Sequence, residues 1–272
     1  MLLRSQLYVP ANDERKIRKS ATLDCDSVVF DLEDAVPPDE KVNARNTLKR
    51  LLDELKWADK ELGVRINKLG EEYSSSDIDA FISESKISFL VLPKSEGNLT
   101  KLAANSGKTL LPLVETALGL LRVEDIVRAE GVFAVGYGAA DFASSVEGKT
   151  RAYLGNLYVK TKLVVAARAY GAAPIDNVFF DLGDLEGFRK EATQSRELGY
   201  VGKQVIHPSQ IQTANIVYSP TPEEIEEARR VVKTYENGGR KKTGALRMDE
   251  QLIDAVHYRQ AKAVLKKIQK GP

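Results

Sequence analysis

The chain has 272 residues, of which 43% are hydrophobic and 29% are charged. This composition excludes collagen-like, low-complexity and disordered chains, because such chains bury too little apolar surface to offset the entropy lost on ordering. The 40 Lys and Arg side chains balance 39 Asp and Glu, so the net charge of +1 provides no bulk field to attract nucleic acid or an anionic membrane. We therefore expect neither nucleic acid nor a membrane among the partners.

The single cysteine, Cys25, excludes an intramolecular disulfide and a zinc site built from several cysteines, which suits a reducing compartment. No stretch approaches the ~18 consecutive apolar residues of a membrane span. Residues 1–6 lead directly into a strand-like segment and lack the apolar region of a signal peptide. Together these features predict a cytoplasmic protein.

Short apolar runs alternate with segments of helical periodicity along most of the chain. The runs that we interpret as strands are 6–9, 27–32, 63–67, 87–93, 110–115, 131–138, 175–179 and 203–207. The helical segments are 14–22, 43–56, 75–85, 119–129, 157–170 and 185–198. Several runs are continuous and β-branched, as expected for parallel strands that are buried on both faces. Such an alternation predicts either a closed (β/α)8 barrel or a doubly wound open sheet.

The ends of the predicted strands favour the barrel. In a barrel these ends converge on one face, where barrel enzymes keep their active sites, whereas an open sheet would spread them along a ridge. No G-x-G-x-x-G motif opens the first strand–helix turn, as it does in many dinucleotide-binding open sheets. Nearly every predicted strand ends on polar side chains, which are Asp31, Glu33, Asp34, Arg65, Asn67, Lys94, Glu115, Asp141 and His207. We therefore predict a (β/α)8 (TIM) barrel.

The pattern changes at about Ser219. A hydroxyl N-cap, prolines in the first turn and two acids predict a helix from there to about Tyr235, ending at Asn237-Gly238-Gly239. A second amphipathic helix is predicted near residues 249–269. The segment is too small to bury a core by itself, so we expect it to dock on its own barrel or on another subunit. The expected domains are a barrel over residues 1–218 and a helical extension over residues 219–272.

Glu115 and Asp141 each follow a strongly apolar strand, where an unpaired buried carboxylate would be costly. One interpretation is that Lys, Arg or backbone N–H groups hold them at the rim of the barrel. The other is a hard-cation site, because two carboxylates with water and substrate oxygens suit Mg²⁺, which keeps several open coordination positions. The residues alone leave both interpretations open.

Arg65 emerges from the third predicted strand with five N–H donors in a planar fork. It could form a salt bridge with Asp31 or Glu33 at the rim, or clamp a substrate carboxylate or a developing enolate oxygen. Of the three acids in Asp31-Leu32-Glu33-Asp34, we expect at least one to pair with Arg65 or Lys41 and another to support the ligands of a metal. We include Asp31 and Glu33 among the catalytic residues.

Lys203 and His207 lie at the two ends of the last predicted strand. A lysine at this place could form a Schiff base, but the carboxylate pair favours a metal as the means of stabilising a carbanion. With one histidine at a strand end and the other, His257, on a predicted helix, a histidine-rich metal site is not expected.

Taken together, the motifs resemble those of the citrate lyase β-subunit-like family, within the Mg²⁺-dependent barrel lyases that include malyl-CoA and citramalyl-CoA lyases and the HpcH/HpaI aldolases. The similarity covers essentially the whole chain. The motifs, in order at strand ends, are Arg4-Ser5-Gln6-Leu7-Tyr8-Val9-Pro10, Asp31-Leu32-Glu33-Asp34-Ala35-Val36 with Lys41 and Arg45, Arg65-Ile66-Asn67, Val114-Glu115-Thr116-Ala117, Gly138-Ala139-Ala140-Asp141 and Gly202-Lys203-Gln204-Val205-Ile206-His207-Pro208.

The resemblance implies a (β/α)8 barrel with Mg²⁺ held by Glu115 and Asp141 and with Arg65 facing the substrate. It implies that the substrate is a 3-hydroxyacyl thioester of CoA or of an acyl carrier protein and that a small keto acid is a product. The thioester and its nucleotide would be bound partly by Arg15 and Lys19.

By the same resemblance, Gly138 and Ala139 contact the substrate, and Asp254 acts as the carboxylic acid that exchanges a proton with the acetyl carbon. The family's C-terminal motif Gly-Lys-Met-Val-Asp-x-Pro keeps its aspartate here as Asp254 but lacks its Gly and Pro. In the resembled lyases this aspartate covers the active site of an adjacent subunit, so we expect a homotrimer or a homohexamer with shared sites. A helix folded back on its own barrel is the alternative.

The predicted function is therefore Mg²⁺-dependent carbon–carbon cleavage, or its reverse, of a thioester such as citryl-, malyl- or citramalyl-CoA. Two alternatives stay open. One is a class II pyruvate-type aldolase that acts on a free hydroxy-keto acid. The other is a non-catalytic subunit of a larger lyase that binds an acyl thioester.

Overall fold

The computed structural model describes residues 2–239, 246–248 and 251–268. These residues divide into two compact units, one formed by Leu3–Tyr218 and the other by the residues that follow, with Leu2. No helix of the described residues is long and apolar enough to cross a membrane.

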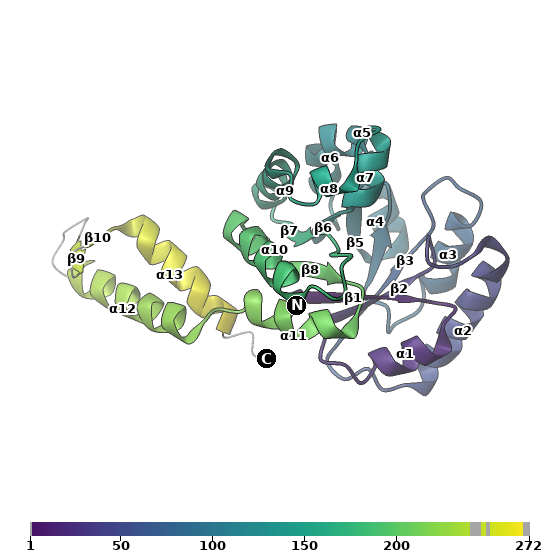
Figure 1. Ribbon diagram of the computed structural model, residues 1–272, viewed down its shortest axis with the longest axis horizontal. Helices are drawn as coiled ribbons and strands as arrows, with labels where there is room; N and C mark the ends of the chain where they lie inside the picture. The colour runs from purple at the N-terminus through teal and green to yellow at the C-terminus, as the bar shows by residue number, and fades with distance from the viewer. Residues whose placement is uncertain (1, 240–245, 249–250, 269–272) are drawn as a thin grey trace. The chain divides into compact units, whose positions relative to one another are not determined.

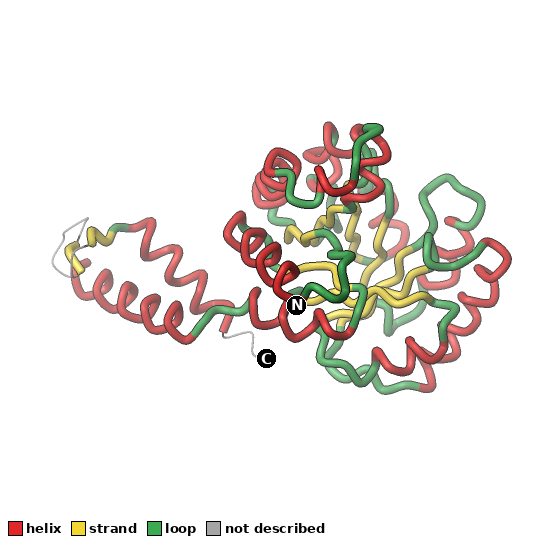
Figure 2. The backbone as a smooth tube through the Cα atoms, in the orientation of Figure 1, coloured by secondary structure: helices red, strands yellow, loops and turns green. Residues whose placement is uncertain are grey.

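The first unit is a closed barrel of parallel strands in the order β1 to β8 (Figures 1 and 2), which confirms the predicted fold. Closure is made by β8 and β1, where Gln204 pairs with Gln6. The strands are β1 (Ser5–Pro10), β2 (Ser27–Asp31), β3 (Glu61–Arg65), β4 (Phe89–Leu92), β5 (Thr109–Val114), β6 (Ala134–Tyr137), β7 (Ala173–Asp176) and β8 (Gly202–Val205).

Apolar side chains fill both sides of the barrel wall. One cluster, which includes Val29, Phe89, Leu111 and Leu113, occupies the interior, and a much larger one lies between the strands and the surrounding helices. Because side chains alternate along a strand, the residue two positions after Leu113 also points inward. That residue is Glu115, so the alternation brings its carboxylate to the interior at the end of β5.

Helices cover the outside of the barrel wall (Figure 1). They are α1 (Glu14–Ser20), α2 (Lys41–Glu54), α3 (Ser74–Phe81), α4 (Thr100–Ser106), α5 (Ala117–Leu121), α6 (Val123–Val127), α7 (Ala139–Ser145), α8 (Thr150–Tyr153), α9 (Leu157–Ala169), α10 (Leu185–Leu198) and α11 (Pro208–Val217), with a 3-10 turn at Pro38–Glu40. The single helix predicted over 119–129 is divided at Arg122 into α5 and α6. The sequence pattern missed α4, α7, α8 and α11, which have ten residues or fewer.

The second unit is a helical hairpin with a small core of its own. α12 (Pro222–Gly239) packs against α13 (Ala255–Ile268), and the short strands β9 (Leu246–Met248) and β10 (Gln251–Ile253) pair in antiparallel fashion between them. Its buried side chains are Ala228, Val231, Ile253 and Ala261. The expectation that this segment has no core of its own was therefore wrong, since two amphipathic helices cover each other.

Two helix boundaries in this unit also differ from the prediction. α12 continues through Gly238 and Gly239 instead of ending at Asn237. The second helix begins at Ala255 and not near 249, because Gln251–Ile253 is a strand and Asp254 caps the helix by accepting from the backbone N–H groups of Val256 and His257. Residues 249 and 269 lie outside the described residues.

Candidate active site at the carboxyl ends of the barrel strands

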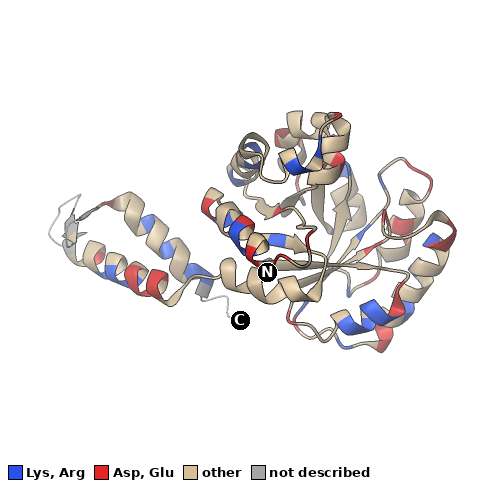
Figure 3. Ribbon diagram, in the orientation of Figure 1, with Lys and Arg blue, Asp and Glu red and all other residues tan. Residues whose placement is uncertain are grey.

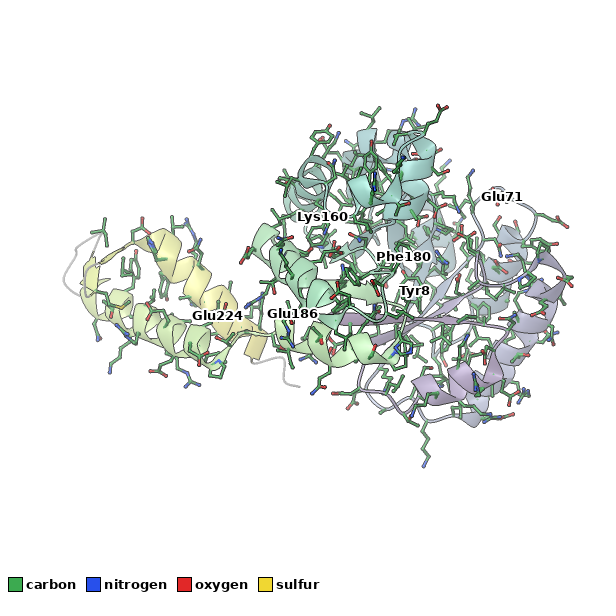
Figure 4. All side chains as sticks on the ribbon, viewed as in Figure 1. Tyr8, Glu71, Lys160, Phe180, Glu186 and Glu224 are labelled. Carbon is green, nitrogen blue, oxygen red and sulfur yellow. The ribbon has the colours of Figure 1, made fainter. Side chains whose placement is uncertain are left out.

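A cavity of about 540 Å³ opens at the carboxyl ends of the barrel strands. Part of its wall is polar, with the carboxylates of Asp31, Glu115 and Asp141 and the guanidinium of Arg65. Another part is apolar and includes Val178, Ile206 and Phe180. Figure 4 labels Phe180 together with Tyr8, which also lines the cavity. The cavity thus brings together five of the strand-end residues that the sequence singled out, which are Asp31, Asp34, Arg65, Glu115 and Asp141.

Arg65 is held on two sides by acids. It lies directly opposite Asp31 in the register of β2 and β3. Its Nε and Nη2 atoms donate to the two Asp31 oxygens over 2.7 and 2.6 Å, and Nη1 lies 3.0 Å from a Glu33 oxygen. Bidentate pairing of this kind fixes the plane of a guanidinium. The structure therefore confirms the salt bridge of the first interpretation and places the same guanidinium on the wall of the cavity.

These buried charges alter each other's protonation. Burial would lower the pKa of the Arg65 guanidinium, but Asp31 and Glu33 hold that pKa well above its ordinary value. Burial raises the pKa of Glu33, against the opposing effects of Arg65 and Lys94. Arg65 therefore stays positively charged, and it contributes a fixed cation to a site rich in carboxylates.

Lys94 contacts three acids of the site, Glu33, Glu115 and Asp141. It follows β4 with a φ of +48°, a left-handed conformation that side-chain-bearing residues rarely adopt. In this conformation its backbone N–H donates to Glu115 over 2.9 Å, while its Nζ lies 2.6 Å from Glu33 and 3.6 Å from Asp141. The sequence named Lys94 only as a strand-end residue and gave no sign of this bridging position.

Glu115 is a buried carboxylate on the cavity wall. It is only 3% exposed, and burial raises its pKa to about 7. Gly138 provides the space for this side chain, because a Cβ at position 138 would overlap the Glu115 carboxylate. The motif that contains Gly138 is therefore explained by contact with Glu115, whereas a contact of Gly138 with substrate stays a prediction.

Asp141 lies in the first turn of α7 and Ala139 begins that helix, and both line the cavity. Asp141 is more open than Glu115, since 38% of its side chain is exposed. A buried carboxylate with a raised pKa and a second, open carboxylate on the same wall form a hard-oxygen donor pair that fits Mg²⁺. The described residues contain no cluster of three or more His, Cys, Asp or Glu that could enclose a metal, so water and substrate would have to complete the coordination.

A second layer of polar contacts supports the loop after β2. The acids of this loop pair with Arg65, one of the two expected partners, whereas the ammonium of Lys41 donates to the backbone carbonyls of Leu32 and Glu33 over 2.8 and 2.9 Å. Asn67 donates to the Leu32 carbonyl and to Asp77. These contacts fix the loop that carries Glu33.

The basic residues of α1 differ in whether they line the cavity. Arg15 and Lys19 are exposed and four residues apart, which places them on one face of the helix. Lys16 lines the cavity and was missed in the sequence. Figure 3 shows that α1 and α2 carry both basic and acidic side chains. Arg18 and Arg50 there pair with Glu14 and Glu54.

Lys203 is fully buried and does not line the cavity. Its ammonium lies 2.7 Å from Asp176 and 2.6 Å from Glu191, and Lys160 lies 2.8 Å from Asp176 on the other side. Burial lowers the pKa of Lys203, but the two acids together hold it above its ordinary value. A charged, fully buried amine cannot attack a carbonyl in the cavity, so the structure argues against a Schiff base at Lys203. His207, for its part, caps α11.

Asp254 belongs to the C-terminal unit. One of its oxygens lies 2.7 Å from His257 Nδ1 and also accepts the helix-capping bonds. The hydrogen bonds from His257 and the backbone lower the pKa of this carboxyl. A proton donor at neutral pH needs the opposite shift, so the role of Asp254 at the barrel site stays a proposal.

The chain matches known protein families over most of its length. A model described as HpcH/HpaI aldolase/citrate lyase matches residues 4–208, and one described as a carbon–carbon bond lyase of the TIM-barrel fold matches residues 159–270. The chain is 34% identical to a (3S)-malyl-CoA thioesterase of Cereibacter sphaeroides, with 97% of this chain and 94% of the relative covered. It is 32% identical to the mitochondrial citramalyl-CoA lyase of Rattus norvegicus, with 96% and 85% covered.

Solved structures agree with this assignment. CitE from Mycobacterium tuberculosis, in complex with magnesium, acetoacetate and coenzyme A, has a TM-score of 0.80 at 26% identity and covers 98% of each chain. The homologues include citramalyl-CoA lyases, and the closed barrel agrees with the TIM-barrel fold that the second family description names. This chain therefore belongs to the HpcH/HpaI aldolase/citrate lyase family of carbon–carbon lyases.

Proposed function

We propose that this protein is a Mg²⁺-dependent lyase that cleaves, or forms, a 3-hydroxyacyl-CoA such as citryl-, malyl- or citramalyl-CoA, with a 2-keto acid and acetyl-CoA as products. The observation that carries the proposal is that one cavity contains Glu115, Asp141 and Arg65. The names of the citramalyl-CoA lyase relatives and the magnesium, acetoacetate and CoA complex of the M. tuberculosis protein support it.

Glu115 and Asp141 are the residues that would hold the cation. When bound there, Mg²⁺ would polarise substrate oxygens and offset negative charge. Glu115 has to be ionised for this purpose, and its pKa of about 7 in the metal-free protein means that metal binding displaces a proton. Lys94 lies beside both carboxylates and keeps them oriented towards the cavity.

Arg65 is the group that would stabilise the reacting oxygen. Cleavage of the carbon–carbon bond leaves negative charge on the thioester oxygen of the acetyl part, and preorganised N–H donors lower the energy of that charge. Asp31 and Glu33 fix the guanidinium in place, so no reorganisation is needed during the reaction. We propose that these two acids act by positioning Arg65.

The thioester portion would extend towards α1. Arg15 and Lys19 are exposed there, and Lys16 lines the cavity, so that basic side chains are available for phosphate groups. Ala139 lies on the cavity wall at the start of α7, where its small side chain leaves room for the acid moiety. We propose that Gly138 and Ala139 contact the substrate from this side.

We further propose that residues 1–218 hold this site and that residues 219–272 supply Asp254 to a neighbouring subunit in a homotrimer or homohexamer. The hydrogen bonds from His257 and the backbone lower the pKa of Asp254 in this unit, so the proton role requires the apolar surroundings that a partner barrel would offer. Arg65→Ala and Asp254→Ala should each be nearly inactive, and co-refolding them should restore part of the activity. Verified mixed oligomers without recovery would show that each site is built from one chain.

Hydrolysis of the thioester is a second candidate, because malyl-CoA thioesterases are relatives at 34% identity over 97% of this chain. A free hydroxy-keto acid aldolase and a non-catalytic thioester-binding subunit are the remaining alternatives. Product analysis with citryl-, malyl- and citramalyl-CoA separates them. Keto acid with acetyl-CoA supports the lyase, whereas free CoA thiol with a hydroxy acid supports the thioesterase. Turnover of free hydroxy-keto acids alone would support the aldolase, and binding without turnover the subunit.

A further inference from the structure

Tyr8 of β1 has a buried hydroxyl for which the described residues offer no hydrogen-bond partner. Tyr8, which Figure 4 labels, also lines the cavity at the carboxyl ends of the strands. A buried hydroxyl without a partner is costly, because its hydrogen bonds to water are lost and not replaced. An unpaired buried hydroxyl in a native protein needs an explanation. A ligand that occupies the cavity and accepts its hydrogen bond would explain it.

Other unpaired polar groups of the barrel interior lie deeper. Gln6 and Ser27 are 0% exposed, and neither lines the cavity. Gln6 precedes Tyr8 by two positions on the same strand, so both point inward, with Tyr8 nearer the carboxyl end. Of these three residues, Tyr8 is therefore the one whose unpaired polar group a molecule in the cavity can reach.

The surroundings of Tyr8 indicate what kind of atom it would meet. The Cζ atom of Arg65 lies 5.5 Å from the centre of the Tyr8 ring, so the ring and the guanidinium share one patch of the wall. Acids face Arg65 at Nε, Nη1 and Nη2. An anionic substrate oxygen beside Arg65 would thus meet a cation whose charge is largely balanced, and it would gain from a neutral donor.

We propose that the Tyr8 hydroxyl donates a hydrogen bond to an oxygen of the acyl substrate on which negative charge lies or develops, beside Arg65. This inference rests on the proposed lyase function and adds Tyr8 to its catalytic residues. The oxygen belongs either to the thioester carbonyl or to the carboxylate of the keto acid. Both oxygens would accept a hydrogen bond from the hydroxyl, and a titration with acetoacetate distinguishes between them.

The test compares Tyr8→Phe with Tyr200→Phe. Tyr8→Phe keeps the ring that faces Arg65 and removes only the unpaired hydroxyl, so the variant should be as stable as the wild type or more stable. Its kcat/KM should fall about 10- to 100-fold, the loss typical of one donor to a charged oxygen. Tyr200 is buried away from the cavity, and its hydroxyl donates to the Lys160 carbonyl. Tyr200→Phe should therefore lose stability and keep its activity.

Calorimetric titration of Mg²⁺-loaded protein with acetoacetate identifies the oxygen. A lower kcat with unchanged acetoacetate affinity assigns the hydroxyl to the thioester oxygen, and a weaker affinity assigns it to the carboxylate. Unchanged kcat/KM and unchanged affinity in Tyr8→Phe would overturn the inference while leaving the lyase function standing. If the wild type turns over no thioester, the proposed function fails, and the titration alone decides whether Tyr8 binds the ligand. A wild type without turnover or acetoacetate binding removes both proposals.

Discussion

Arg65 and Asp31 face each other across the β2–β3 pair and are joined by two hydrogen bonds of 2.7 and 2.6 Å. The pair lies on the wall of the cavity, so the residue that would stabilise the reacting oxygen is itself fixed by the register of two strands. We propose that Asp31 acts as a positioning residue for Arg65, so its removal should disturb both the fold and the chemistry.

Asp31→Asn should reduce stability by roughly 1.5–3 kcal/mol, because one charge-assisted bond is lost and Arg65 keeps a poorer partner. The kcat should fall more than KM rises, since a misplaced guanidinium fails mainly in the transition state. Urea denaturation and steady-state kinetics check both effects. Asp125→Asn, which breaks the exposed pair with Arg128, is the control and should change neither. An Asp31→Asn variant with wild-type kcat would show that this pair only supports the barrel rim.

Gly138→Ala tests the space that Glu115 occupies. The added methyl group overlaps the Glu115 carboxylate, so that side chain has to move. We expect Mg²⁺ affinity to fall at least about 10-fold, the effect typical of disturbing a metal's supporting contacts. Gly97→Ala is a matched control, because nothing lies within 4 Å of a Cβ there. Calorimetric titration with Mg²⁺ measures both variants, and equal affinities would remove Glu115 from the metal site.

The pKa of Glu115 gives the metal-free protein a defined pH dependence. Because the folded-state pKa of about 7 exceeds the ordinary value of 4.5, the folded state holds the proton more tightly than the unfolded state. The contribution of Glu115 to stability is thus present below pH 4.5 and is lost as the pH rises through about 7. Ionised Glu115 binds the cation, so the increase in Tm produced by Mg²⁺ should be larger at pH 8 than at pH 6.

Thermal denaturation with and without Mg²⁺ at the two pH values measures this difference. Glu115→Gln is the control, because it cannot ionise and should show a small, pH-independent response to the metal. A wild-type Mg²⁺ response that is equal at pH 6 and pH 8 would contradict the assignment of Glu115 as a ligand that must lose a proton.

Lys203→Met should destabilise the barrel without a direct effect on the chemistry. The substitution leaves Asp176 and Glu191 buried with one fewer cation, and breaking a buried ion pair typically costs about 3–5 kcal/mol. Borohydride treatment in the presence of a keto acid should not attach the acid to Lys203. Mass spectrometry of the treated protein checks this, and a reduced adduct on Lys203 would revive the Schiff-base alternative.

Arg15→Ala combined with Lys19→Ala should raise the KM for CoA thioesters and leave kcat little changed, because both side chains are exposed and neither lines the cavity. The effect should diminish at high salt, as expected for exposed charges that bind phosphate. Lys190→Ala on α10 is the control, since Lys190 is also an exposed helical lysine. An unchanged KM in the double variant would place the nucleotide elsewhere.

Much of the barrel could be predicted from the sequence because period and burial are local signals. The apolar runs of β3 and β5 and the polar residues at their ends were sufficient to place Arg65 and Glu115 on one face. Tyr8 was missed because an alternating aromatic residue in β1 looks like ordinary core packing. The contacts of Lys94 depend on a left-handed φ, which cannot be predicted from the pattern of residues. The capping of α13 by Asp254 was missed because residues 251–253 were predicted to be part of a helix and not a strand.

The dependence of carbon–carbon cleavage on Mg²⁺ held by Glu115 and Asp141 is the central claim, and one kinetic measurement addresses it most directly. Enzyme stripped with EDTA is assayed for keto acid release from malyl- and citramalyl-CoA while Mg²⁺ is added back, alongside Glu115→Gln and Asp141→Asn. We predict no release without metal, full recovery in the wild type, and at least about 100-fold lower kcat/KM in both variants at saturating Mg²⁺. Equal turnover with and without Mg²⁺, or wild-type turnover in both variants, would contradict the account.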